Sequence, residues 1–269
     1  MIYIPNADFS KCTNLLYSDS PSYSGILAGE CKGDVWVHQL ENPELAMVYS
    51  NSVGGFSILG EPKNHSVYDD FHQFLREVFF AELINKGFGG FEFSVESPIA
   101  EKYLLNLFSD KRIHQEDEYF FRSSAGGRLQ AMYEYSIVRV DADFIDRLSA
   151  SEFDHPEMVT DRILQSWETY EQFFKRSLAF AAVSGKSIAA VIAGTARYQN
   201  IIPIDIETRE EHRRKGLANA LTKYFVNACM ENGLTAQWNC VDSNIASRKT
   251  AIKAGFQFLK KRPFYWFAI

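Results

Sequence analysis

The sequence has no large excess of positive charge. Lys and Arg number 28 against 34 Asp and Glu, which gives a formal net charge of -6 at pH 7. The one dense basic run is Arg213-Arg214-Lys215, whereas proteins that bind nucleic acid neutralise phosphates with broad clusters of Lys and Arg. The composition therefore argues against a nucleic-acid partner.

Cysteines are few and have none of the spacings that usually give them a chemical role. The four cysteines, Cys12, Cys31, Cys229 and Cys240, lie far apart in the chain, without a Cys-x-x-Cys pair or a Cys/His spacing typical of a metal site. We therefore expect buried, reduced thiols and no bound metal.

Long apolar runs are also absent. The N-terminal residues contain no basic segment followed by an apolar one, and no uninterrupted apolar stretch is long enough to cross a bilayer. We expect a cytoplasmic protein without a membrane partner.

What the chain does have is the composition of an ordinary globular protein, with 46% hydrophobic and 23% charged residues. Its 269 residues suit one large domain or two modest ones, because single cores stop growing at roughly 250–300 residues. We predict two domains.

Residues 1–140 have the pattern of a mixed α/β unit. Runs of β-branched and aromatic residues predict strands, and apolar side chains that recur every three or four residues predict helices. The predicted strands are residues 35–37, 46–49, 56–59, 91–95, 118–122 and 130–140, and the predicted helices are residues 68–86 and 98–108.

A polar, acidic stretch near residues 141–161 indicates a boundary, so we predict domains of residues 1–140 and 141–269. The second domain reads as β-β-β-α-β-α-β after a first helix. Its predicted helices are residues 162–176, 217–230 and 244–254; its predicted strands are residues 178–183, 187–198, 202–208 and 235–240, with the last strands within 258–267.

The strongest local signal is a strand ending at Thr208, followed by a basic turn and a helix that opens at Gly216-Leu217-Ala218. A helix start leaves backbone N–H groups unpaired and carries about half a positive charge, so it accepts a pyrophosphate readily. Gly216 and Ala218 are small enough to let phosphate oxygens approach the amides. A basic helix start with an incidental glycine has the same pattern.

The turn resembles motif A of the GCN5-related N-acetyltransferase (GNAT) family, Gln/Arg-x-x-Gly-x-Gly/Ala after an extended strand. A second block, from Asn244 to Gly255-Phe256, resembles the family's next motif, in which Asn opens a helix beside the pantetheine. The resemblance covers about residues 167–269. Within it, Thr-x-x-x-x-Arg-Arg-Lys-Gly-Leu-Ala and Trp238-Asn239-Cys240 are similar to the subgroup typified by the zwittermicin A self-resistance acetyltransferase.

The resemblance implies an α/β (α+β) fold: a mixed, mostly antiparallel GNAT sheet flanked by helices, preceded by a reduced GNAT-like N-terminal domain. It implies acetyl-CoA as cofactor and transfer of acetyl to a primary amine of a small molecule, by direct attack in a ternary complex. A homodimer is a possible assembly. In the first domain the counterpart of the turn, residues 60–65, lacks the motif, and Pro62 removes a donor, so we expect no coenzyme A there.

Mapped onto the motifs, the amides of Ile206, Glu207 and Thr208 face the acyl and pantetheine portion, and those of residues 214–219 face the pyrophosphate. The implied cofactor-binding residues are Ile206, Glu207, Thr208, Arg213, Arg214, Lys215, Gly216, Leu217, Ala218, Asn219, Asn244 and Ser247.

Three residues are candidates for proton transfer. Asp205 and Glu207 share one face of their strand and are candidate bases, although each alone could equally be a solvated edge carboxylate. Many relatives carry a Tyr as general acid where this chain has Ala251, and Ser247 is the nearest hydroxyl; its other interpretation is a residue of the helix's first turn. For Cys240 we favour a buried structural thiol over a nucleophile.

Two other functions stay open at this point. Ala251 and the reduced first domain are also compatible with a non-catalytic acyl-CoA sensor or interaction protein. Transfer of a different acyl or aminoacyl group is a further alternative, because pocket volume depends on side chains that the sequence does not place.

Overall fold

The computed structural model describes residues 1–17, 19–123, 125–129 and 131–269. The chain forms two compact units, Met1–Asp117 with Arg262–Ile269, and Glu118–Lys261. The sequence placed the boundary at residues 140/141, and the structure corrects it. Residues 118–122 pair with the second unit's strand at Gln237–Val241, and the last residues of the chain pair with the first unit.

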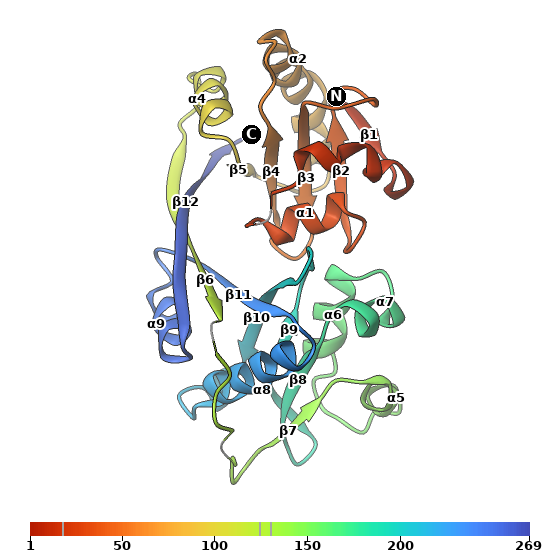
Figure 1. Cartoon of the computed structure of the whole chain (residues 1–269), viewed down its shortest axis with the longest axis vertical. Helices are drawn as coiled ribbons and strands as arrows, with labels where there is room; N and C mark the ends of the chain where they lie inside the picture. Colours follow the sequence, from red (N-terminus) through yellow and green to blue (C-terminus); the bar gives the residue numbers. More distant parts are fainter. Residues whose placement is uncertain (18, 124, 130) are drawn as a thin grey trace. The chain divides into compact units, whose positions relative to one another are not determined.

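The first unit is built on a sheet in the order β1-β2-β3-β4-β5-β12 (Figure 1). Its strands are β1 (Ile2–Ile4), β2 (Gly33–Val37), β3 (Leu45–Ser50), β4 (Gly55–Gly60), β5 (Gly90–Val95) and the C-terminal part of β12 (Phe256–Ala268). Neighbours are antiparallel except β4 and β5, which are parallel. The four strands predicted between residues 35 and 95 are confirmed.

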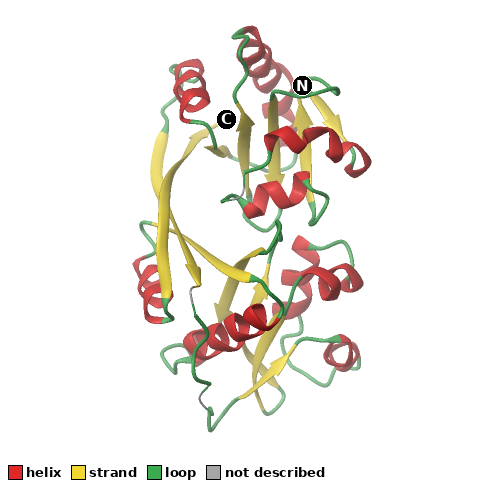
Figure 2. Cartoon of the chain, viewed as in Figure 1, coloured by secondary structure: helices red, strands yellow, loops and turns green. Residues whose placement is uncertain are grey.

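Helices flank this sheet (Figure 2). They are the 3-10 segment η1 (Asn6–Leu15), α1 (Pro21–Leu27), α2 (Ser66–Phe74), the π-helical η2 (Leu75–Phe79), α3 (Phe80–Asn85) and α4 (Pro98–Leu107). The helix predicted over residues 68–86 is therefore continuous but contains a π turn. Fully buried Phe71, Leu75, Phe91 and Phe93 show that its apolar face and β5 form the core of this unit.

The second unit has a sheet in the order β6-β11-β10-β9-β8-β7. Its strands are β6 (His114–Ser123), β7 (Ser136–Arg139), β8 (Ala179–Ser184), β9 (Ser187–Gly194), β10 (Ile201–Thr208) and β11 (Thr235–Val241). Only β10 and β11 are parallel among the pairs that the described residues form here. The strands predicted over residues 130–140 and 187–198 are shorter than expected, and Gln130 lies outside the described residues.

The helices of this unit are α5 (Ala142–Ser149), α6 (Glu157–Ser166), α7 (Tyr170–Arg176), α8 (Leu217–Glu231) and α9 (Ile245–Lys253). Helix α8 packs across β8 to β11, and α6 packs on β9. The apolar residues of α8 that face the sheet, Leu217, Leu221 and Phe225, are buried. The predicted end of α8 is confirmed, with Gly233 in the left-handed region at φ 67°.

Three predictions for this half are wrong in detail. The helix expected over residues 162–176 is two helices, because Trp167 is fully buried with its indole N–H donating to the Gly194 carbonyl at 3.0 Å, and Thr169 caps the second helix. The acidic stretch interpreted as a boundary contains α5, capped by Asp141. The expected last strands are one strand, β12.

No helix in the described part of the chain combines the length and the apolar character needed to cross a membrane.

Candidate functional site

Two parallel strands separate in the sheet of the second unit. β10 and β11 pair from Ile201 with Thr235 to Ile204 with Trp238. Beyond that point, Asp205–Thr208 pairs with β9 and Asn239–Val241 pairs with β6. The facing edges of β10 and β11 therefore carry backbone groups that do not bond to each other there.

The hydrogen bonds at the two ends of this segment show which amides face the open edge. Thr195 N–H donates to the Pro203 carbonyl at 2.9 Å, and Arg209 N–H donates to the Ala189 carbonyl at 3.0 Å. Because bonded positions alternate along an antiparallel pair, the peptide groups of Asp205 and Glu207 face β9. Those of Ile206 and Thr208 face the open edge, so the expectation for the Glu207 amide is wrong.

The turn after β10 directs the chain into α8 through two left-handed residues, Arg214 at φ 62° and Gly216 at φ 84°. Within the described residues, no acceptor is found for the backbone N–H groups of residues 214–219. The first helical bond runs from Ala220 N–H to the Gly216 carbonyl at 3.0 Å. A Cβ built on Gly216 meets nothing within 4 Å, so the space in front of these amides is open.

Positive charge surrounds this row of amides. Arg213, Arg214 and Lys215 are all exposed, and Arg213 Nε donates to the Thr208 carbonyl at 3.1 Å. A hydrogen bond to Tyr135 is the largest cause that raises the pKa of Lys215, followed by its charge interactions with Tyr135 and Glu134. The Lys215 ammonium is thus fully charged at neutral pH.

Asn219 adds a polar group at the first turn of α8. Its side-chain oxygen is buried, and no hydrogen-bond partner is found for it among the described residues. This oxygen is an acceptor and is not a ligand for phosphate, whereas the unpaired amides and the open space over Gly216 form a donor-rich turn that fits a diphosphate. The residues predicted for the pyrophosphate are therefore brought together.

The second motif, which begins at Asn244, forms the start of α9 and is held by side-chain hydrogen bonds. Asn244 caps α9 by accepting from Ser247 N–H at 3.0 Å, and the Ser247 hydroxyl accepts from the Trp238 indole N–H at 2.9 Å. Ala251, one turn further on, is fully buried. The position where many relatives carry a phenol is thus a core position, and Ser247 is the hydroxyl that the structure places on the adjoining turn.

The cysteines are buried, as predicted. Burial raises the pKa of the Cys229 thiol to about 12 and that of Cys12 to about 11. Burial is also the main cause that raises the pKa of Cys240, while a hydrogen bond to Ser247 acts in the opposite direction. A thiol held protonated is a poor nucleophile, which agrees with a structural role for Cys240.

Asp205 and Glu207 lie on the face of β10 opposite α8. Ile202 and Ile204 pack with Leu217 of α8, and side chains alternate between the faces of a strand. Both carboxylates form ion pairs with the guanidinium of Arg162 on α6. Arg162 was not predicted from the sequence, because it lies 43 positions before Asp205. The sequence did contain one indication of such a cation. Asp205 and Glu207 place two negative charges on one strand face, and a shared positive side chain nearby would stabilise both.

The corresponding turn of the first unit has a different hydrogen-bond pattern. Ser66 N–H donates to the Asn64 side chain at 3.1 Å, Val67 N–H to the Asn64 carbonyl at 3.2 Å, and Tyr68 N–H to the His65 carbonyl at 3.0 Å. Lys63 N–H donates to the Glu44 carboxylate at 3.2 Å. These amides already have acceptors within the protein.

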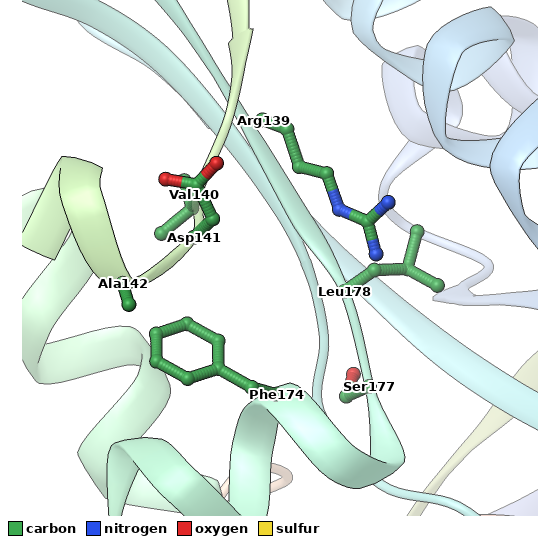
Figure 3. A pocket seen from close by; sticks show the side chains of 7 residues that line it. All are labelled: Arg139, Val140, Asp141, Ala142, Phe174, Ser177 and Leu178. Atoms are coloured by element: carbon green, nitrogen blue, oxygen red, sulfur yellow. The ribbon is translucent and has the colours of Figure 1, made fainter.

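A hollow of about 380 Å³ also lies at the β7 edge of the second unit's sheet. Arg139, Val140 and Asp141 line it from the end of β7, and Phe174 lines it from α7 (Figure 3). Two strands, β8 and β9, separate β7 from β10. This hollow contains none of the predicted site residues.

A strand followed by a basic turn and a helix with unpaired N-terminal amides is the arrangement that the resemblance to GNAT acetyltransferases implied. The family model described as GNAT acetyltransferase matches residues 19–265. The chain belongs to the GNAT acetyltransferase family. Membership supports acyltransferase activity, with acetyl-CoA as the donor that the family uses.

One curated relative is an uncharacterized N-acetyltransferase, YdfB, from Bacillus subtilis. It is 29% identical over 128 residues, which cover 48% of this chain and 46% of the relative. The match therefore spans less than half of that protein.

Solved structures share the fold over most of the chain. A GCN5-related N-acetyltransferase-like protein from Streptococcus suis has a TM-score of 0.59 at 19% identity, covering 87% of this chain and 88% of the other. A tandem GNAT protein from the clavulanic acid biosynthesis pathway has a TM-score of 0.58 at 12% identity, covering 98% and 88%. The predicted fold class and the GNAT family are confirmed.

Proposed function

We propose that the second unit binds acetyl-CoA at the turn before α8 and transfers its acetyl group to a primary amine of a small molecule. The observation that carries the proposal is the row of unpaired amides at residues 214–219, next to the open edge of β10. Family membership supports the donor. The amine is inferred from the resemblance to the zwittermicin A resistance subgroup.

Each part of the site then has a role. The amides of residues 214–219 and the side chains of Arg213 and Lys215 hold the pyrophosphate. The open-edge amides of Ile206 and Thr208 hold the pantetheine and polarise the acyl carbonyl. Bound acetyl-CoA supplies an activated thioester. Asp205 or Glu207 accepts the proton of the attacking amine, and Ser247 or water protonates the departing thiolate.

We also propose that the first unit does not bind coenzyme A. In the turn before α2, the amides of Lys63, Ser66, Val67 and Tyr68 have acceptors within the protein, unlike the row of amides before α8.

Thiol release tests the activity. We expect the protein to release coenzyme A from acetyl-CoA in the presence of at least one small primary amine, well above the rate without amine. The assay uses the full-length protein, a thiol reagent and a broad panel of amines. Saturable acetyl-CoA binding without release across the whole panel would favour the sensor, the second function that the buried Ala251 leaves open.

A further inference from the structure

Arg162 connects helix α6 to the exposed half of β10. Its two terminal nitrogens form separate ion pairs, one with Asp205 and one with Glu207. The Arg162 side chain is 14% exposed, whereas the two carboxylate side chains are 56% and 50% exposed. The cation is therefore the fixed member of the cluster, and the two acids are held against it from the solvent side.

The arrangement has a direct consequence for the two acids. Residues two apart on a strand face place like charges close together, where they repel each other. A planar guanidinium with several donors in a fork can pair with both at once, whereas a lysine ammonium is a single point charge. With one cation between two carboxylates, the cluster carries one net negative formal charge.

A polar pocket adjoins this cluster. It has a volume of about 380 Å³. Glu157, Asp161 and Arg162 line it from α6; Glu207 lines it from β10, and Arg209 lines it from the position directly after β10. Asp205 is not among the residues that line it. The Arg209 guanidinium contacts Glu211 and donates to the Ser187 hydroxyl at 2.7 Å. Of the two candidate bases, Glu207 is therefore the one that a molecule in the pocket can reach.

We propose that this pocket receives the amine acceptor and that Arg162 is a positioning residue that presents Glu207 to it. The proposal rests on the proposed transferase function and deepens it. The amine nitrogen forms a bond to the acyl carbon, its proton passes to the Glu207 carboxylate, and the carbon–sulfur bond breaks. Coenzyme A leaves as a thiolate, which takes a proton from Ser247 or from solvent.

Other charged groups face the same pocket and contribute to its pH response. They are His155, Glu157 and Asp161 before and on α6, and Arg209 after β10. His155 Nδ1 lies 3.2 Å from the Glu157 carboxylate. A pH profile alone does not isolate Glu207, so the test uses paired substitutions.

The experiment compares Arg162→Ala, Arg162→Lys, Glu207→Gln and Asp205→Asn, together with the double variant Arg162→Ala/Glu207→Gln. The acceptor is an amine that the wild-type protein acetylates. We expect Arg162→Ala and Glu207→Gln each to lower kcat/KM for the amine by about 100-fold, at the lower end of what general base catalysis supplies. Arg162→Lys restores part of the loss, and Asp205→Asn has a smaller effect than Glu207→Gln.

The double variant gives the readout that separates positioning from a structural role. If Arg162 acts through Glu207, the double variant is no slower than Glu207→Gln alone. The dissociation constant of acetyl-CoA stays the same in all variants, because Arg162 and the amides of residues 214–219 lie on opposite faces of β10. Arg147→Ala is the matched control, since Arg147 on α5 forms an ion pair of 2.9 Å with Glu152, outside the proposed site.

Two results would overturn the proposal: unchanged kcat/KM in Arg162→Ala, or losses from Arg162→Ala and Glu207→Gln that multiply in the double variant. The failure of the proposed function looks different. In that case the wild-type protein itself would bind no acetyl-CoA or would release no thiol with any amine.

Discussion

We expect the substitution Gly216→Glu to abolish the binding of acetyl-CoA and the substitution Gly233→Glu to leave it unchanged. Gly216 stands before α8, where a glutamate places both bulk and negative charge in front of the amides of residues 214–219. Hydrogen bonds to a charged group contribute about 1.5–3 kcal/mol each. The loss of two of them corresponds to at least about 100-fold in affinity.

Gly233 is a matched control at the other end of the same helix. Both glycines are left-handed, at φ 84° and φ 67°, and a Cβ on either meets nothing within 4 Å. The backbone strain of the two substitutions is therefore similar, on the order of 1–2 kcal/mol. A carboxylate at the N-terminus of α8 is favourable for the helix, so unfolding does not explain a loss of binding by Gly216→Glu.

Equilibrium binding of acetyl-CoA, with circular dichroism as a check on folding, measures both variants. A folded Gly216→Glu protein with the wild-type affinity would exclude the turn before α8 as the phosphate site. Equal losses in the two variants would point to strain in α8 rather than to a lost contact.

The second large effect concerns stability and a buried ion pair of the first unit. The Glu96 side chain is 2% exposed and that of Arg262 is 9% exposed. Glu96 accepts from Arg262 and from the Ser20 hydroxyl, and from the Ser57 hydroxyl at 3.3 Å. We expect Glu96→Gln to lower the free energy of unfolding by about 3–5 kcal/mol, because it removes one member of a buried ion pair.

Equilibrium unfolding in urea measures this loss. The double variant Glu96→Gln/Arg262→Met should be more stable than Glu96→Gln alone, because it also removes the remaining member of the broken ion pair. The control is Asp110→Asn, since the Arg76–Asp110 pair is 3.9 Å apart with both side chains more than half exposed; its cost should be below about 1 kcal/mol. A double variant less stable than both singles would show that the pair's charge balance does not determine its contribution.

Local patterns in the sequence predicted the elements that carry the cofactor site. Apolar spacing and Gly233 fixed the extent of α8, and Asn244 marked the start of α9. These signals are local because helix caps and helix periodicity involve neighbouring residues. The cradle for the diphosphate was therefore predictable.

Features that depend on distant residues were not predictable in this way. The C-terminal residues of β12 pair with β5 of the first unit, which moved the boundary between the units. Arg162 meets Asp205 only through the packing of α6 on the sheet. The break at Trp167 depends on a hydrogen bond to Gly194 on β9. In each case the partner lies far away in the sequence.

The most direct test of the account is a calorimetric comparison of acetyl-CoA with S-acetylpantetheine, which keeps the thioester but lacks the pyrophosphate and the nucleotide. We expect the wild-type protein to bind acetyl-CoA at least about 100-fold more tightly, because the amides of residues 214–219 act on the pyrophosphate. In Gly216→Glu that preference should disappear. Equal affinities for the two ligands in the wild-type protein would show that the turn before α8 does not hold the diphosphate.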